Sequence, residues 1–434
     1  MQLNREARLK RVGNIVFANQ SLRGAVLVII QASCFEYIIE VTTMNEFQQK
    51  LYNALLELTQ LKPKAFIVLE LPLENEIYQV FNYRLLPNYT TWLTNGSALQ
   101  CRGITFRMDR NDNIRPVELA SFPFEKFFNL GENPLALEEN LDLSTVTEIL
   151  VKEDGSLISS MLLPSGKLFL KSKASFGSPQ ANAANELIAT PEWKELHDWT
   201  LDWATRGYTV IMEYTSPSNK IVLPYTKSAL TILGLRNHAD GSYENLFAMD
   251  LPAGIKKLVV KNLVDEVEDT KAFVQSIPKQ TEIEGYVVRL QSGQRVKIKT
   301  SWYKNLHGLG FNKKLTNLDI AKLVLDQTID DVRSENANCP ETLQRIDKVT
   351  QVVSTFYNDA VATTTSLYEA HKKVRKPGFD KKQDKRDFVA KARQEELPRP
   401  LFNIAMQLYD DKEVDMAKFV LNHVKKKGIE GLTV

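Results

Sequence analysis

The chain has 434 residues, enough for two domains, and its 43% hydrophobic and 25% charged residues are those of an ordinary soluble globular protein. A formal net charge of +2 excludes a protein that coats nucleic acid over its whole surface, so any contact with polyanions must come from local basic surfaces. Cys34, Cys101 and Cys339 stand far apart with no histidine at ligand spacing, which excludes a recognisable zinc site and fits a reducing cytosol.

Residues 1–43 differ in character from the rest of the chain. They begin with basic side chains and continue in an apolar run, 25–30, that has only the length of a strand. The wider stretch 25–41 contains Gln31, Glu36 and Glu40 and is too short to cross a bilayer. We therefore expect no membrane helix and no signal peptide, and a cytoplasmic protein, or one in the host cytoplasm if the source is viral.

Met44 begins an amphipathic pattern in which Phe47, Leu51, Leu55 and Leu58 repeat at helical spacing. We predict a helix here, and we expect the working fold to begin at Met44. Residues 1–43 are then an N-terminal appendage of unknown role.

From about residue 65 the pattern changes to short apolar runs separated by turns, which is typical of strands. Pro164-Ser165-Gly166 predicts a hairpin, and a helical stretch at 185–203 interrupts the strands. We predict an α+β domain built on antiparallel sheet over residues 44–305. The predicted strands are 66–69, 78–83, 103–106, 157–163, 168–173, 208–214, 220–225, 230–235, 285–290 and 295–299.

After about residue 305 the apolar residues repeat only at helical spacing, so we predict an all-helical domain over residues 306–434. Residues 371–393 in this region hold ten Lys or Arg against three acids. Such a run is either a solvated surface or a patch that contacts phosphates.

Lys152-Glu153-Asp154-Gly155-Ser156 follows three apolar residues that read as the end of a buried strand. A partly buried lysine has a pKa below its usual value of about 10.4, so that some of it is a free amine able to attack an electrophile. The alternative is an ordinary Asp-Gly turn.

Two pairs of lysines each share one face of a predicted strand, because side chains alternate with a period of two. They are Lys297 with Lys299 and Lys171 with Lys173. Such a pair either faces water or clamps the triphosphate of a nucleotide.

Glu213 lies inside an apolar strand and Glu284 immediately precedes another. A carboxylate in such a place is costly unless it is paired or binds a metal. These two are site candidates, although either could instead form a salt bridge with a structural arginine.

Lys152 to Ser156, Glu213, Glu284 to Val287 and Lys297 to Lys299 occur in the order and spacing of the covalent nucleotidyltransferase superfamily of ligases and capping enzymes. Within it the chain resembles the bacteriophage RNA ligase 1 family from about Met44 to the C-terminus, most strongly up to residue 310. The further stretches that carry the resemblance are 101–104, 125–130, 132–134, 169–173, 219–223, 301–303 and 306–307.

The resemblance implies an antiparallel-sheet nucleotidyltransferase (ATP-grasp-like ligase) domain followed by the helical domain. It implies an ATP-dependent RNA ligase that uses ATP and Mg²⁺. Lys152 would attack ATP to form a lysyl-adenylate, AMP would pass to a 5′-phosphate RNA end, and a 3′-hydroxyl would displace AMP. The implied role is RNA repair, with tRNA as a possible substrate, by a monomer.

The resemblance also assigns roles to residues. Lys152, Glu213, Glu284, Lys297 and Lys299 would be catalytic. The nucleotide phosphates would be held by Arg102, Lys126, Lys171, Lys173, Lys297 and Lys299. The metal ligands would be Glu213, Glu284, Asp330, Asp331 and Tyr303.

Leu150 departs from the superfamily pattern, since many members have a glutamate there that can read the adenine amine. No OB-type barrel is evident after residue 305, which disfavours a DNA ligase or capping enzyme. The alternatives are a non-catalytic RNA-binding module with a ligase-like core, and a nucleotidyltransferase that acts on another acceptor. The intact set of Lys152, acids and cations argues against the binding module.

Overall fold

The structure is a computed structural model of the whole chain. It describes residues 44–61, 65–85, 89–109, 115–219, 222–306, 315–337, 339–375, 378–412 and 414–432. Before residue 44 it describes the backbone of five strands, of which β4 and β5 form an antiparallel hairpin. These strands are β1 (Lys10–Val12), β2 (Ile15–Phe17), β3 (Ser21–Leu22), β4 (Ala25–Ala32) and β5 (Phe35–Thr42).

Helix α1 (Glu46–Leu58) confirms the helix predicted after Met44. The side chain of Asn45 accepts a hydrogen bond from the backbone nitrogen of Gln48, and the Gln48 side chain accepts one from the backbone nitrogen of Asn45, so each residue caps the other in the first turn. Leu51, Leu55 and Leu58 are buried on its inner face, as their spacing predicts.

Twelve strands after α1 form three four-stranded sheets in the described part of the chain. Their orders are β6-β7-β8-β9, β13-β12-β14-β15 and β10-β17-β16-β11, and all neighbours are antiparallel except β10 and β17. The strands are β6 (Phe66–Leu73), β7 (Glu76–Tyr83), β8 (Ile104–Met108), β9 (Pro116–Ser121), β10 (Phe128–Asn129), β11 (Val146–Val151), β12 (Ser156–Leu162), β13 (Leu168–Ser172), β14 (Tyr208–Thr215), β15 (Ala229–Asn237), β16 (Gly285–Leu290) and β17 (Arg295–Lys299).

Helices cover these sheets, and the predicted helical stretch 185–203 falls within two of them. The predicted hairpin is confirmed, since β12 and β13 pair across Pro164-Ser165-Gly166. The helices are α2 (Thr90–Thr94), α3 (Gly96–Gln100), α4 (Pro179–Ile188), α5 (Lys194–Thr205), α6 (Ala253–Lys256) and α7 (Thr270–Ser276).

The strand predicted at 220–225 is wrong for its described part. Residues 222–225 run in bends without ladder pairing, and residues 220–221 lie outside the described residues. The physical reason is that the backbone nitrogens of Val222 and Leu223 bond to the loop that follows Lys152 instead of to a neighbouring strand.

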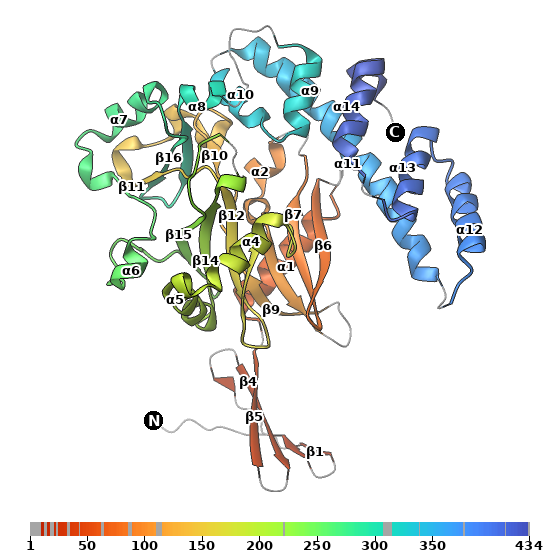
Figure 1. Cartoon of the computed structure of the whole chain (residues 1–434), viewed down its shortest axis with the longest axis horizontal. Helices are drawn as coiled ribbons and strands as arrows, with labels where there is room; N and C mark the ends of the chain where they lie inside the picture. The colour runs from red at the N-terminus through yellow and green to blue at the C-terminus, as the bar shows by residue number, and fades with distance from the viewer. Residues whose placement is uncertain are drawn as a thin grey trace.

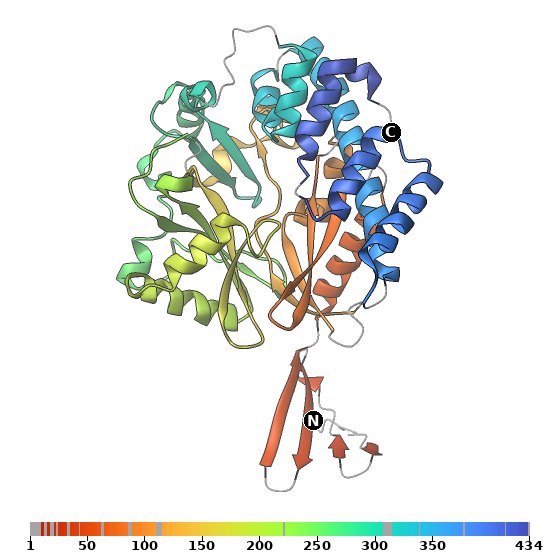
Figure 2. The same ribbon diagram turned by 45° about the vertical axis from the view of Figure 1, so that its right-hand side comes forward.

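The strands end with β17, and every element described after it is helical. Figures 1 and 2 show α11 to α14 lying alongside the sheet that contains β6 and β7. The α+β class with a following helical region is thereby confirmed. The helices are α8 (Ser301–Leu306), α9 (Asn317–Leu325), α10 (Ile329–Glu335), α11 (Pro340–Val374), α12 (Lys381–Gln394), α13 (Arg399–Tyr409) and α14 (Met416–Lys427).

The helical region has its own buried cluster, to which Ile346, Val349 and Val353 of α11 contribute. Within the described ranges, no helix combines the length and the apolarity that a membrane span requires. The basic segment 371–393 comprises the end of α11 and most of α12, and its residues 376–377 are outside the described part.

Candidate active site

Lys152 lies at the end of strand β11, which runs through the core and delivers it to the centre of the site. Its backbone nitrogen donates to the carbonyl oxygen of Gly285, 2.9 Å away, on the adjacent strand β16. Its ammonium lies 2.9 Å from Oε2 of Glu284, and its side chain is 22% exposed. The predicted partly buried lysine is therefore present, and it faces a carboxylate.

Gly285 fixes the position of Glu284. Its φ of +148° favours glycine, and a Cβ there would collide with the carbonyl oxygen of Ile298 on β17. The carbonyl oxygen of Glu284 accepts a hydrogen bond of 2.9 Å from the backbone nitrogen of Thr300. The close approach of β16 and β17 thus holds the Glu284 carboxylate between two lysines.

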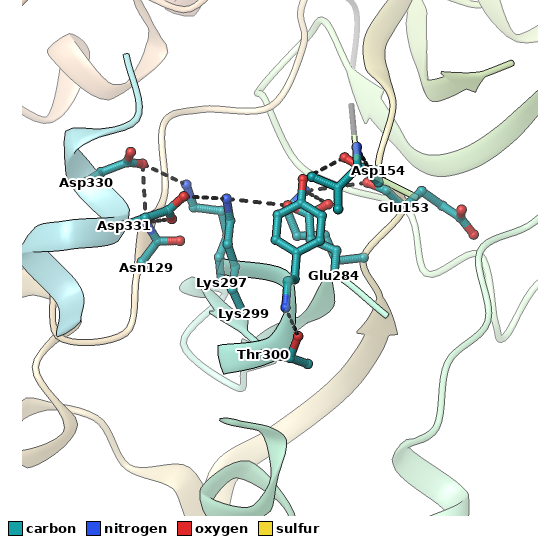
Figure 3. A network of polar contacts seen from close by, with 12 residues as sticks. Asn129, Glu153, Asp154, Glu284, Lys297, Lys299, Thr300, Asp330 and Asp331 are labelled. Atoms are coloured by element: carbon teal, nitrogen blue, oxygen red, sulfur yellow. Dashed lines mark hydrogen bonds and ion pairs between the residues drawn. The ribbon is translucent and has the colours of Figure 1, made fainter. Parts of the chain in front are cut away.

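The loop after Lys152 is held by Asp154, which is 1% exposed. Its Oδ2 accepts hydrogen bonds of 2.8 and 2.7 Å from the backbone nitrogens of Val222 and Leu223, and its Oδ1 accepts one of 2.7 Å from the hydroxyl of Tyr303. Asp154 therefore ties the loop to the 222–225 segment and to α8. This network, with the lysine and aspartate residues around it, is drawn in Figure 3.

Tyr225, which the sequence reasoning did not single out, completes the same loop. Its hydroxyl accepts a hydrogen bond of 2.9 Å from the backbone nitrogen of Asp154 and donates one of 3.0 Å to Oε2 of Glu153. A tyrosine in a Pro-Tyr turn carries no sequence signal for this role, because the contact spans 71 positions along the chain.

Lys297 and Lys299 share one face of β17, while Val296 and Ile298 are buried on the other, as the period of two predicts. They do not face open water, since their side chains are 16% and 14% exposed. The alternative of a solvated lysine face is therefore wrong for this pair.

Both lysines are paired with acids of helix α10. Lys297 lies 3.5 Å from Asp330 Oδ2, and Lys299 lies 3.0 Å from Asp331 Oδ2 and 3.4 Å from Glu284 Oε1. Figure 3 shows the aspartates approaching the lysines from the side opposite to Glu284. The side-chain nitrogen of Asn129 donates to both aspartates at 3.2 Å.

The close packing of these lysines and aspartates shifts their pKa values. Although burial opposes its charge, the nearby lysines, led by Lys297, lower the pKa of Asp330 to about 2. Burial lowers the pKa of Lys297. Burial also opposes the charge of Lys299, but the adjoining acids, led by Asp331, outweigh it and raise the pKa of Lys299 above the ordinary value. The two lysines therefore have different electrostatic environments one pleat apart.

Glu213 of β14 is 9% exposed, and among the described residues its carboxylate has no hydrogen bond or ion pair. Burial raises its pKa to about 8, and the nearby Lys152 only partly offsets this. Gly155 packs against the same strand, because a Cβ on it would collide with the carbonyl oxygen of Tyr214. The structural salt bridge with an arginine that the sequence left open for Glu213 is absent from the described contacts.

A second group of cations lies around Tyr83 at the end of β7. The ammonium of Lys173 lies 4.6 Å from the centre of its ring. Burial opposes ionisation of Tyr83, but Lys126, Lys173 and Arg102 together outweigh it and lower the pKa of the phenol to about 8. Lys126 also lies 3.9 Å from Glu132 Oε1. Arg102, Lys126 and Lys173 are thus brought together, as the resemblance implies.

Lys171 does not join this group. Its side chain is fully buried and its ammonium donates to the carbonyl oxygen of Gly103, 2.9 Å away, so it supports the backbone beside Arg102. Burial lowers its pKa to about 7. The two members of this lysine pair thus have different surroundings, and the shared strand face predicted for them is wrong, because β13 ends at Ser172, before Lys173.

The expected metal ligands are not assembled into one cage. Among the described residues no three His, Cys, Asp or Glu side chains form a cluster that could hold a metal ion. Asp330 and Asp331 contact lysines, and the Tyr303 hydroxyl donates to Asp154. Glu213 remains the buried carboxylate with spare coordination capacity, which suits a Mg²⁺ ion held mainly by substrate phosphates and one or two protein carboxylates.

Residues 100–303 match the model of a family described as RNA ligase, so all the site residues from Arg102 to Tyr303 lie in the matched region. A Thermovibrio ammonificans protein provisionally named as an RNA ligase is 24% identical over 64% of this chain and 70% of its own length. RNA ligase 1 of bacteriophage TS2126 is 25% identical over 62% of this chain and 66% of its own length. A solved archaeal ATP-dependent RNA ligase covers 81% of this chain and 94% of its own, at 10% identity and a TM-score of 0.38.

Proposed function

We propose that this chain is an ATP-dependent RNA ligase that joins a 5′-phosphate to a 3′-hydroxyl through a lysyl-AMP intermediate on Lys152, as its similarity to RNA ligases supports. The observation that carries the proposal is the position of the Lys152 ammonium, 2.9 Å from Glu284 and within a line of buried ionic contacts that continues to Lys299. An amine placed beside a proton acceptor and next to phosphate-binding cations is what nucleotidyl transfer to lysine requires.

In the first step, the Lys152 nitrogen forms a bond to the α-phosphorus of ATP and the bond from that phosphorus to the bridging oxygen of the β-phosphate breaks. Pyrophosphate leaves, and the Lys152 ammonium loses two protons in all, one as the nitrogen–phosphorus bond forms and one beforehand, when it becomes the free amine. Glu284 is the group in hydrogen-bonding reach of these protons. Because Asp154 and Tyr225 fix the loop that follows Lys152, the side-chain nitrogen of Lys152 is oriented before ATP binds.

Lys297 and Lys299 hold the phosphates that become pyrophosphate. Asp330 and Asp331 now pair with the same two ammonium groups, so the phosphates must share or replace these contacts. The cationic surface for the same polyanion is extended by Arg102, Lys126 and Lys173. Lys171 supports the backbone next to Arg102, because its ammonium donates to the carbonyl oxygen of Gly103.

Mg²⁺ fits the site through Glu213 and Glu284, where it would neutralise charge on the phosphates. The fit rests on the unpaired, buried carboxylate of Glu213. Asp330, Asp331 and Tyr303 are held by other residues in this structure, so a metal contact there would require them to exchange partners.

In the second step an oxygen of the RNA 5′-phosphate attacks the AMP phosphorus and the bond to Lys152 breaks, which returns a proton to the lysine. In the third step the RNA 3′-hydroxyl attacks the 5′-phosphate, AMP leaves, and the hydroxyl proton is released. We propose repair of broken RNA, including tRNA, as the role, with residues 44–305 as the adenylation domain and 306–434 as the RNA-contacting domain of a monomer.

A non-catalytic RNA-binding module with this core, and a transferase with another acceptor, are the competing functions. The ion pairs that join Lys152 to Glu284 and Glu284 to Lys299 favour an enzyme, because RNA binding alone does not require a lysine held against a largely buried carboxylate.

The test is joining of a single-stranded RNA with 5′-phosphate and 3′-hydroxyl ends in the presence of ATP and Mg²⁺. The same RNA with a blocked 3′ end should stop at the adenylated RNA. Self-adenylation without RNA joining or RNA adenylation would favour another acceptor, and the absence of both would favour the binding module.

A further inference from the structure

A cavity of about 110 Å³ lies where the end of β7 and helix α2 meet helices α9, α10 and α11. Leu85, Trp92 and Val324 give it apolar walls, and all three are buried. Its lining also holds charged side chains of both signs, Arg84, Lys126 and Arg333 with Glu132 and Asp330. Cavities of roughly 150 Å³ hold a six-membered ring, so this space is close to the size that one flat ring needs.

Two hydroxyl groups in this cavity have no partner. Thr350 and Ser354 are one turn apart on α11, are 9% and 0% exposed, and both line the cavity. Among the described residues neither hydroxyl oxygen has a hydrogen-bond partner. Buried hydroxyls are normally satisfied, so two unpaired hydroxyls in a cavity that also has the apolar side chains of Leu85, Trp92 and Val324 indicate a ligand with both a flat apolar face and a polar edge. A nucleobase has both.

The cavity also borders the phosphate-binding part of the site. Lys126 and Asp330 line it, and Asp330 is the partner of Lys297 at 3.5 Å. A path of ion pairs runs from Lys152 through Glu284 and Lys299 to Asp331, and the side chain of Asn129, which donates to both Asp331 and Asp330, connects it to the lining of this cavity.

The geometry of phosphoryl transfer indicates which part of the substrate lies beyond Lys297 and Lys299. Attack and departure at phosphorus are roughly in line, so pyrophosphate leaves from the side opposite to Lys152. The RNA 5′-phosphate that later displaces Lys152 must enter from that same opposite side. We therefore expect the nucleoside attached to this phosphate beyond the lysines of β17, where Lys126 and Asp330 line the cavity.

We propose that this cavity binds the base of the 5′-terminal nucleotide of the donor RNA strand, with its edge on Thr350 and Ser354. The inference rests on the proposed ligase function and names the part of the RNA that the helical region contacts.

The first test uses the unmodified protein with two donor RNAs of the same length, one normal and one with an abasic ribose at the 5′-terminal position. We expect kcat/KM for joining to fall 10- to 100-fold with the abasic donor. An equal kcat/KM for the two donors would overturn the proposal, whatever the variants do.

The second test narrows the cavity with Thr350→Leu. Its control is Thr363→Leu, an exposed threonine on the same helix. We expect Thr350→Leu to lower kcat/KM for the normal donor 10- to 100-fold, to cause little further loss with the abasic donor, and to leave self-adenylation and the KM for ATP unchanged. A raised KM for ATP would assign the cavity to the base of ATP instead, and equal losses with both donors would show a general structural effect. Either result overturns the proposal.

These tests distinguish a wrong assignment of the cavity from a wrong proposal of ligase function. Loss of self-adenylation or of all RNA joining in the unmodified protein would contradict the ligase proposal. Normal joining that is indifferent to the terminal base would contradict only the assignment of the cavity.

Discussion

The hydroxyl of Tyr225 lies 2.9 Å from the backbone nitrogen of Asp154 and accepts its hydrogen bond. The same hydroxyl donates to Glu153, so one side chain from outside the Lys152 loop sets the direction of its second and third residues. Asp154 then bonds back to Val222 and Leu223, which precede Tyr225. The loop and the 222–225 segment therefore hold each other.

Tyr225→Phe should slow self-adenylation. It removes the acceptor for a largely buried backbone N–H and the donor to Glu153, which costs about 1–3 kcal/mol in the oriented state. We expect a 10- to 100-fold lower rate with little change in the KM for ATP. Joining of RNA that is already adenylated should fall much less, because that step does not use the lysine as a nucleophile. Equal losses in both assays would mean that Tyr225 acts through overall stability.

Gly285→Ala should damage both the site and the fold. Glycine is required at a φ of +148°, and a methyl group would push β16 away from Ile298. We expect the free energy of unfolding to fall by about 1–3 kcal/mol. The rate of self-adenylation should fall further than this loss of stability explains, since Glu284 moves with this backbone. Gly166→Ala, at a turn where an added Cβ meets no atom within 4 Å, is the control for the cost of a positive φ alone. Full activity in Gly285→Ala would contradict the role given to this strand pair.

Lys171 predicts a pH dependence of stability. Its pKa is about 7 in the folded chain, against an ordinary value of 10.5, because burial disfavours its charge. Between pH 7 and 10.5 the unfolded chain holds the proton that the folded chain has lost, so stability contributed by this group rises with pH across that window. Relative to Lys171→Met, the parent should gain on the order of 2 kcal/mol between about pH 7 and 9, measured by urea unfolding. If the difference in free energy of unfolding between the parent and Lys171→Met did not change with pH, Lys171 would titrate at its ordinary pKa.

The basic face of α12 predicts a salt effect on RNA binding. Lys382, Arg386 and Arg393 share one face of this helix and are exposed. Replacing all three by glutamine should weaken RNA binding and reduce the slope of log K against log salt by about 0.7 for each lost phosphate contact. Self-adenylation should stay unchanged. An unchanged slope would identify this face as an ordinary solvated surface.

Much of the site follows from local sequence. Apolar residues before Lys152 predict the strand that delivers it, and the alternation in Arg295–Lys299 predicts which side of β17 carries the two lysines. Both are properties of neighbouring residues, and period and burial determine them. The order of these motifs along the chain carried the resemblance.

The remaining features depend on contacts between distant segments. Nothing near Asp330 and Asp331 in sequence shows that they pair with Lys297 and Lys299, and nothing near Lys171 shows that it lies under Gly103. The strand predicted at 220–225 fails for the same reason, because Asp154, 68 positions earlier, takes the backbone donor of Val222. Such contacts are set by the packing of the sheets and helices.

The measurement that tests the central claim most directly is the intact mass of the protein after incubation with ATP and Mg²⁺, with Lys152→Ala as its control. The proposal predicts that the parent gains the mass of one AMP and that the variant gains none. A parent that remains unmodified while folded, or a Lys152→Ala protein that still gains AMP, would contradict the assignment of Lys152 as the nucleophile.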